Sequence, residues 1–269
     1  MNEELLIASL GLISGASFLY LMWNNFFEDE IKKEWKIILD PHYHDKKKLK
    51  SAVYTTLKDS TTKLGYLLRK NFESFFNQIY YLSLNLDLNP IIPFSTFYAE
   101  TLYKYSVSND YGALGLGQLR SIAFLDLYYK DRRFWQKIAS NIRHYTNNYL
   151  LFQNTRNFYS DFKRLGKLLS FYNLSNETYY QIILNLTLAS LRYMKDVITV
   201  LKRLKNKIDQ TRLCPFICYL YGYHDGITKL INFDFGQILK FKSKYKGYIK
   251  KFYNFANKCG VKVNVGKCL

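Results

Sequence analysis

The feature of this chain that most restricts its fold is a helical spacing of apolar residues over long stretches. One such stretch begins at Leu49 and continues through Val53, Leu57, Leu64 and Leu68. Apolar positions three and four residues apart form one face of an amphipathic helix. The 269-residue chain contains only 13 Gly and 4 Pro, too few for the many turns of a sandwich of short strands. We therefore expect a mainly α-helical protein.

The same pattern divides the chain into segments. Residues 49–79, which Gly65 interrupts, are expected to form one long or two medium helices. The turn-forming sequence Asp87-Leu88-Asn89-Pro90 ends this region. Further helices are predicted at 94–106, 120–130, 133–152, 156–172, 178–206 and 212–222. We expect four regions. They are an N-terminal anchor or uncleaved signal at 1–27, a helical linker region at 28–88, a main domain at 89–235 and a basic C-terminal tail with a peripheral helix at 236–269.

The N-terminal segment predicts a membrane anchor. Leu5 to Trp23 are nineteen consecutive uncharged residues, a length just sufficient for a tilted transmembrane helix. Ser14-Gly15-Ala16 could serve as a signal-peptidase site, but Glu3 and Glu4 replace the usual positive charges. An uncleaved anchor is therefore favoured over a removed signal or a buried core helix.

The chain is strongly basic. It contains 39 Lys and Arg against 21 Asp and Glu, a formal net charge of +18. Such a charge favours polyanions, including nucleic acids, anionic lipids and acidic wall polymers, without selecting one of them. A coding bias towards Lys explains the charge equally well. Since no compact basic motif or RNA-binding aromatic signature is present, we expect no nucleic-acid partner.

The four cysteines leave their redox state open. Cys214 and Cys218 share one helix face but lack the second half of a zinc site. Cys259 and Cys268 could close a small disulfide loop if this part of the chain lies outside the cytoplasm. Buried free thiols are the alternative.

Glu100 is the strongest candidate for a catalytic residue, although its surroundings permit two interpretations. Lys104 lies four residues further on, the favourable order for a surface ion pair on a helix. Phe97 and Tyr103 could instead form an aromatic wall that raises the pKa of the carboxyl.

Three elements around Glu100 follow one another in a recognisable order. Glu100-Thr101 is followed by Gly112-Ala113-Leu114-Gly115-Leu116-Gly117-Gln118, and Tyr223-His224-Asp225-Gly226 comes later. The segment from Asn185 to Lys195 lies between them. Together they resemble the catalytic core of the soluble lytic transglycosylases, glycoside hydrolase family 23, which is related in fold to goose-type lysozyme. That family has Glu-Ser, Gly-Ala-X-Gly-Leu-Met-Gln and Tyr-Asn-Ala-Gly, and the resemblance covers roughly residues 90–235.

Several positions depart from the family pattern. Thr101 replaces Ser and keeps its hydroxyl, whereas Gly117 replaces Met, which we expect to remove a side chain from the cleft. Asn109 stands where the family has a loop serine. His224 and Asp225 replace Asn and Ala. We expect these substitutions to change contacts with the substrate.

The resemblance implies a lysozyme-like helical domain and a peptidoglycan lytic transglycosylase. Glu100 would be the single acid/base group that cleaves the MurNAc-GlcNAc β-1,4 bond and leaves a 1,6-anhydro-muramoyl end. No metal or cofactor is implied. The substrate-binding residues would be Gln118, Tyr223, Thr101, Gly115, Leu116, Gly117 and Asn109.

The implied partners are glycan strands, the membrane through the N-terminal helix, and an envelope machine as a further candidate. We expect a single-pass protein of the cytoplasmic membrane, with the catalytic domain in the periplasm or another extracytoplasmic space.

Two other functions stay open. A goose-type lysozyme would hydrolyse the same bond with water, which Asp110 or Asp225 could position. A catalytically inactive, membrane-bound scaffold would bind glycan while an envelope-spanning machine assembles. Retention of Glu100, Gln118 and Tyr223 favours an enzyme over the scaffold.

Overall fold

The computed structural model describes residues 28–58, 60–108, 110–171 and 173–268, and this part of the chain is mainly α-helical, as predicted. A helix over residues 28–39 comes first. It is followed by α2 (Lys46–Lys58), α3 (Lys63–Lys70), α4 (Phe72–Asn85), α5 (Ile91–Thr101), α6 (Ser121–Lys130), α7 (Arg132–Thr146), α8 (Phe158–Phe171), α9 (Asn176–Thr211), α10 (Pro215–Asp225), α11 (Ile227–Asn232), α12 (Phe235–Lys244), α13 (Lys246–Lys258) and α14 (Val265–Cys268).

The predicted membrane anchor at residues 5–23 lies outside the described residues. Among the helices in the described part of the chain, none is both long enough and apolar enough to cross a membrane.

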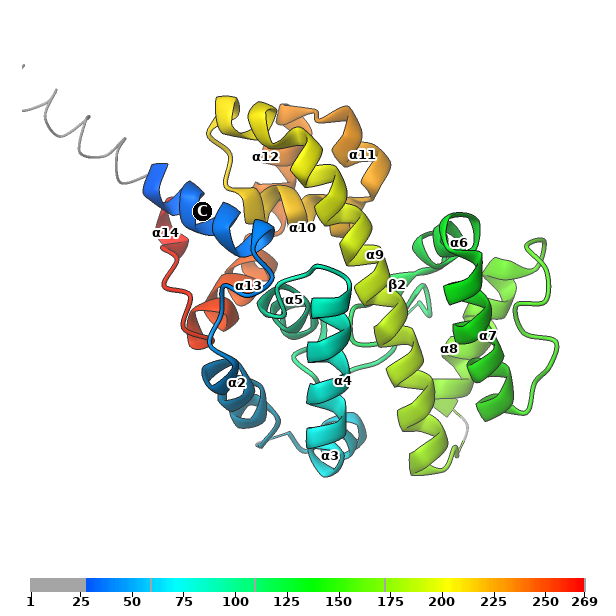
Figure 1. The fold of residues 1–269 in the computed structure, drawn as a ribbon. Coiled ribbons are helices and arrows are strands. Elements are labelled where there is room, and N and C mark those ends of the chain that lie inside the picture. The colour runs from blue at the N-terminus through cyan, green and yellow to red at the C-terminus, as the bar shows by residue number, and fades with distance from the viewer. Residues whose placement is uncertain (1–27, 59, 109, 172, 269) are drawn as a thin grey trace, which may run out of the picture.

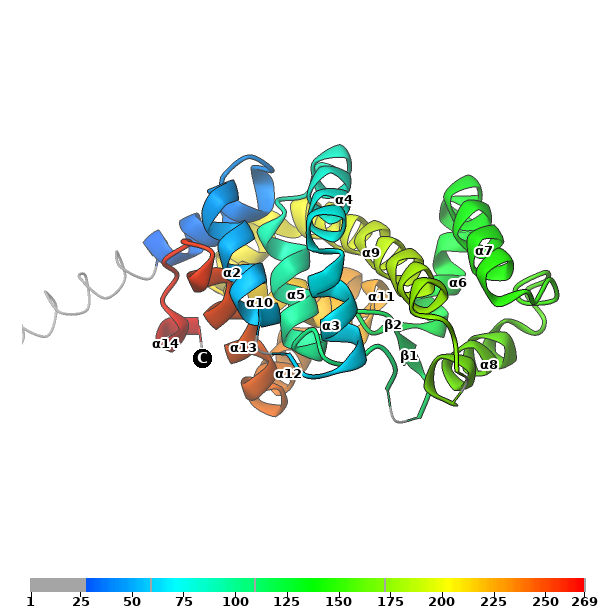
Figure 2. The ribbon, with the colours of Figure 1, turned by 90° about the horizontal axis from the view of Figure 1, so that it is seen from below.

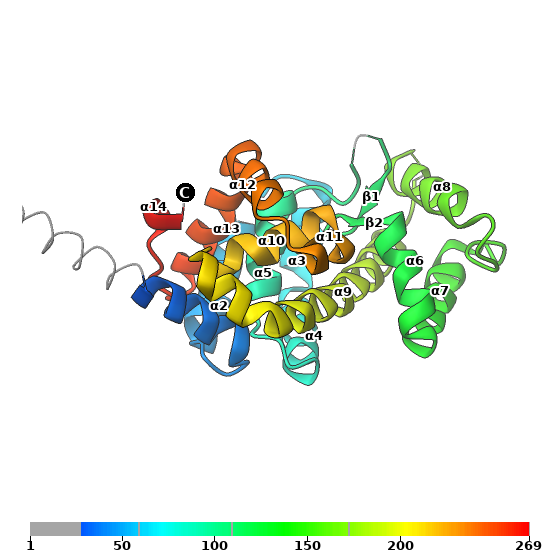
Figure 3. The same cartoon turned by 90° about the horizontal axis from the view of Figure 1, so that it is seen from above.

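Helix α9 is the axis of the molecule (Figure 1). It is 36 residues long and begins at Ser175, whose hydroxyl accepts a hydrogen bond from the backbone N–H of Thr178. Helices α6, α7 and α8 lie together on one side of it, whereas α2, α5 and α13 lie on the other (Figures 2 and 3). The apolar residues that recur along α9 are buried mainly by α7 and α10, with α3, α4, α6 and α11 also in contact.

Helix α13 packs along α5 and belongs to the core. Phe255 of α13 stacks on Tyr98 of α5, with 4.8 Å between the ring centroids. Ile249, Phe252 and Tyr253 are fully buried. The C-terminal region is therefore not the peripheral tail that we expected from its basic composition.

Helix α5 ends earlier than the pattern predicted. Its last residue is Thr101, and Leu102 and Tyr103 follow in the left-handed region with φ of 52° and 56°. The helix predicted at 94–106 is therefore wrong beyond Thr101. Because the chain turns here, Lys104 does not lie one helical turn from Glu100. The region 49–79 is also divided more finely than predicted, since it contains α2, α3 and most of α4.

A small hairpin follows α5 and was not predicted. Strand β1 (Ala113–Leu114) pairs antiparallel with β2 (Leu119–Arg120). Gly115 begins the turn with φ of 77°, and a Cβ there would lie 2.9 Å from the Leu186 side chain of α9. Only glycine satisfies both the backbone angle and this close approach. The hairpin is thereby held against α9.

The cysteine pairing differs from the one considered above. Cys214, at the N-cap of α10, forms a disulfide with Cys268 of α14. Cys218 and Cys259 are buried free thiols.

Candidate active site

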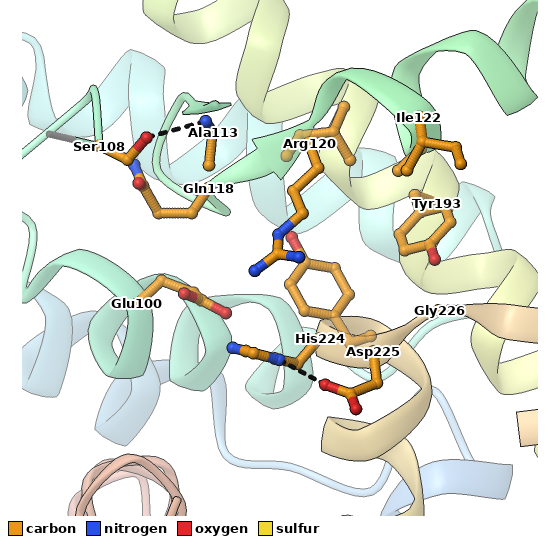
Figure 4. Close-up of a pocket in the computed structure, with 13 residues that line it drawn as sticks. Glu100, Ser108, Ala113, Gln118, Arg120, Ile122, Tyr193, His224, Asp225 and Gly226 are labelled. Atoms are coloured by element: carbon orange, nitrogen blue, oxygen red, sulfur yellow. Dashed lines mark hydrogen bonds and ion pairs between the residues drawn. The ribbon is translucent and has the colours of Figure 1, made fainter. Parts of the chain in front are cut away.

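An open cavity of about 280 Å³ lies where α5, the β1–β2 hairpin, α6, α9 and α10 meet (Figure 4). Its walls combine charged, polar and apolar side chains. They are Glu100, Ser108, Ala113, Gln118, Leu119, Arg120, Ile122, Ala123, Tyr193, Tyr223, His224, Asp225 and Gly226. The three sequence elements singled out above therefore converge on one cavity.

Glu100 lies in the last turn of α5, with its carboxyl directed into the cavity towards Arg120 and His224 (Figure 4). Its Oε1 accepts a hydrogen bond of 2.8 Å from the Tyr248 hydroxyl. Burial raises the pKa of Glu100 to about 7, although Tyr248, Arg120 and Lys251 act in the opposite direction. The carboxyl can therefore hold and release a proton near neutral pH, as general acid/base catalysis requires.

Tyr248 is the residue at this site that sequence reasoning missed. It belongs to α13, in the region expected to be a peripheral tail. The apolar spacing of Ile249, Phe252, Tyr253 and Ala256 does predict a helix with a buried face. However, such spacing does not indicate which helix this face contacts, so it could not bring Tyr248 to Glu100.

Tyr223 connects α10 to the hairpin. Its hydroxyl donates a hydrogen bond of 2.6 Å to the backbone carbonyl of Gly117, and its ring stacks on Tyr219. The hydrogen bond to Glu100 comes from a different tyrosine, Tyr248. Tyr223 thus fixes the hairpin at the edge of the cavity.

Gln118 also lines the cavity and supports the turn of the hairpin. Its Nε2 donates a hydrogen bond of 2.9 Å to the carbonyl of Gly115. Gln118 itself has φ of 45°, a left-handed conformation that places it at the end of the turn.

Four of the expected substrate-binding residues do not line the cavity: Thr101, Gly115, Leu116 and Gly117. The Thr101 hydroxyl donates to the Phe97 carbonyl and accepts from the Tyr103 N–H, so it stabilises the end of α5. Leu116 is fully buried. In the structure these four residues do not face the cavity, and their role in substrate binding stays a prediction. Asn109 lies outside the described residues.

Gly117 faces the protein interior. A Cβ at this position would lie 2.5 Å from the Tyr223 hydroxyl and 2.7 Å from the Ser190 side chain of α9. The expectation that glycine here removes a side chain from the cleft is therefore wrong. The glycine instead lets the hairpin approach α9 and α10.

We expect Gly117→Ala to lower the free energy of unfolding by about 1–3 kcal/mol, because it overpacks this contact. Gly247→Ala is the matched control, since nothing lies within 4 Å of a Cβ there. Alanine in helix α13 should be neutral or slightly stabilising. Urea unfolding of both variants measures the difference, and equal stability would contradict the tight packing at Gly117.

The cavity also contains charged side chains besides Glu100. Asp225 Oδ1 lies 2.8 Å from His224 Nδ1, and Lys229 pairs with the same carboxylate at 3.5 Å. Arg120, on β2, extends between Glu100 and the hairpin (Figure 4). A second carboxylate and a cation thus share the cavity with Glu100.

A comparison of this chain with protein-family models, with curated proteins and with solved structures found no match.

Proposed function

We propose that this protein is a peptidoglycan lytic transglycosylase and that Glu100 is its acid/base group. The observation that carries the proposal is the convergence of Glu100, Gln118 and Tyr223 on one cavity, with a carboxyl whose pKa is raised to about 7. These residues come from the three separate elements that resemble the transglycosylase motifs. A protonated carboxyl in an open cavity is suited to protonating a glycosidic oxygen.

One carboxyl is sufficient because the substrate supplies the nucleophile. Glu100 protonates the glycosidic oxygen as the bond breaks, and then accepts the proton of the C6 hydroxyl of the muramoyl residue. This hydroxyl attacks C1 of the same sugar and closes the 1,6-anhydro ring. An intramolecular nucleophile in good alignment is worth about 7–11 kcal/mol. The Tyr248 hydroxyl keeps the carboxyl oriented through both proton transfers.

Hydrolysis of the same bond is the second candidate function. The position of Asp225 favours it. Its carboxylate lines the cavity that contains Glu100. Inverting glycosidases use a second carboxylate as the base that activates water. Asp225 could take that role, although His224 and Lys229 already contact it.

Mass spectrometry of the products separates the two reactions. Purified sacculi are digested with the protein, and the soluble muropeptides are analysed without chemical reduction. Transglycosylation leaves anhydro-muramoyl ends, which are one water lighter than the reducing ends that hydrolysis leaves. Products with only reducing ends would refute the transglycosylase and support the hydrolase. The absence of any product would refute both.

The pH dependence of the rate tests the role of Tyr248. A general acid acts while protonated, so activity should fall as pH rises through about 7, the pKa of Glu100. The Tyr248 hydrogen bond lowers this pKa by stabilising the carboxylate. We therefore expect Tyr248→Phe to move the alkaline limb of the kcat profile to higher pH. An unchanged limb would show that Tyr248 does not influence the catalytic carboxyl.

The same proposal places the protein on the outer side of the cytoplasmic membrane, anchored through residues 5–23, because peptidoglycan lies there. An alkaline phosphatase fused to the C-terminus is then expected to be active, since this reporter requires export. Activity of a cytoplasmic reporter fused at the same position would contradict this placement.

A further inference from the structure

A second buried carboxyl, Glu34, lies outside the cavity in the helix over residues 28–39. Glu34 is fully buried. Its Oε2 accepts a hydrogen bond of 2.8 Å from the backbone N–H of Phe216, and its Oε1 accepts one of 2.7 Å from the Tyr253 hydroxyl. No Lys or Arg of the described residues forms an ion pair with it. A buried acid without a cationic partner is costly when charged, so this position calls for an explanation.

The sulfur atoms of a disulfide lie beside this carboxyl. Oε1 of Glu34 is 3.2 Å from Sγ of Cys268, and Cys214 Sγ is within 4.8 Å of the same group. A disulfide sulfur has no hydrogen to donate. The contact is therefore a hydrogen bond only when Glu34 carries the proton and donates it to sulfur.

Burial favours that protonated form. Burial, with a smaller contribution from Glu30, outweighs the lowering effect of the bonds from Phe216 and Tyr253 and raises the pKa of Glu34 to about 8. Glu30 in turn pairs with Lys33 at 3.0 Å. At neutral pH, Glu34 is thus a neutral acid in contact with Cys268.

We propose that the Cys214–Cys268 disulfide is a redox-active site that exchanges with dithiols, and that Glu34 is its acid/base group. The structure puts an acid at the sulfur that must leave with an electron pair. A leaving thiolate in a buried site is unfavourable unless a nearby acid protonates it.

The exchange proceeds in two steps. A thiolate of the dithiol attacks Sγ of Cys214, the bond to Cys268 breaks, and Cys268 Sγ takes its electron pair and the proton of Glu34. The second thiol of the dithiol then loses its proton and attacks the first dithiol sulfur, and Cys214 leaves as a thiolate. The dithiol becomes a disulfide, and its two protons reprotonate Glu34 and Cys214.

The position of Cys214 suits its role as the second leaving group. It is the N-cap of α10, where the helix dipole favours a thiolate. Cys218, one turn along the same helix, is in contrast fully buried, and burial together with Glu34 raises the pKa of its thiol. Cys218 is therefore an internal control that should stay unreactive while the fold is intact.

Access to the disulfide requires local opening of the C-terminal segment, because both sulfur atoms are buried. This segment is short. It is held by the Asn264 N–H, which donates to Glu30 Oε2, and by two hydrogen bonds between Asn257 and Val263. Few contacts need to break, so opening can occur without global unfolding.

The test is the reduction of the oxidised, full-length protein by dithiothreitol between pH 6 and 9. Samples are quenched with an alkylating reagent, and the alkylated cysteines are identified and counted by mass spectrometry. Each reduction rate is then divided by the concentration of dithiothreitol thiolate. We expect the normalised rate for the wild type to fall as pH rises through about 8, as Glu34 loses its proton. In Glu34→Gln the rate should be at least about 10-fold lower and independent of pH.

Glu100→Gln is the matched control, because it changes a buried acid elsewhere and should leave the reduction rate unchanged. Cys218 serves as the control for unfolding in every sample. It should stay unmodified as long as the disulfide is reduced in the folded protein. If Glu34→Gln does not fold, the wild-type profile alone decides. A flat normalised profile, an unchanged rate in Glu34→Gln, or alkylation of Cys218 together with Cys214 would each overturn the proposal.

Discussion

Glu100→Gln is expected to lower the release of anhydro-muropeptides from sacculi by at least about 10²- to 10⁴-fold. Glutamine has nearly the same shape and still accepts the hydrogen bond from Tyr248, but it cannot deliver a proton and take one back. Because the same group serves both steps, its loss affects the whole reaction. The measurement is the rate of product formation by chromatography and mass spectrometry, with circular dichroism to show that the fold is retained.

Lys104→Ala is the control for the alternative interpretation of Glu100. Lys104 is exposed and lies beyond the turn that ends α5, so its removal should leave activity unchanged. Loss of activity in Lys104→Ala, or near wild-type activity in Glu100→Gln, would move the acid/base group away from Glu100. Asp225→Asn is informative in the same assay, because it should abolish activity only if Asp225 activates water.

The free energy of unfolding is expected to fall by about 5 kcal/mol between pH 4.5 and 8 because of Glu34 alone. The pKa of this carboxyl is about 8 in the folded protein against 4.5 as its ordinary value. Below pH 4.5 both states are protonated and the group has no effect. Between the two values the unfolded chain releases a proton that the folded protein keeps, so unfolding becomes easier. Above pH 8 both states are charged and the loss is constant.

Glu34→Gln should remove this part of the pH dependence. Urea unfolding of the oxidised protein at several pH values, with and without the substitution, measures the difference. Glu100 contributes a separate decrease between pH 4.5 and its pKa of about 7, which Glu100→Gln removes. If the wild type and Glu34→Gln lose stability in parallel, Glu34 is not protonated in the folded state.

The helices could be predicted from the sequence because their signals are local. The apolar spacing in 178–206 and 212–222 corresponds to α9 and α10 to within a few residues. The end of α5 could not be predicted, because leucine and tyrosine, the residue types at Leu102 and Tyr103, do not favour a left-handed backbone. The hairpin was missed because each of its strands has only two residues, too short for any pattern.

The candidate site was predictable only where its residues belong to contiguous motifs. Glu100, Gln118 and Tyr223 were found in this way, and all three line the cavity. Thr101 and Leu116 stand in the same motifs but face the interior, since neighbouring residues on an element point in different directions. Tyr248 depends on the packing of α13 against α5, which no local pattern specifies.

The hydrogen bond between Tyr248 and Glu100 also has a consequence for synthesis. The two residues are 148 positions apart, and the donor follows Glu100 in the sequence. A growing chain on the ribosome therefore exposes Glu100 long before the tyrosine that orients it has been made. Until α13 has been synthesised, the carboxyl lacks this partner and the wall that α13 provides. The surroundings of Glu100 are therefore complete only once α13 has been synthesised.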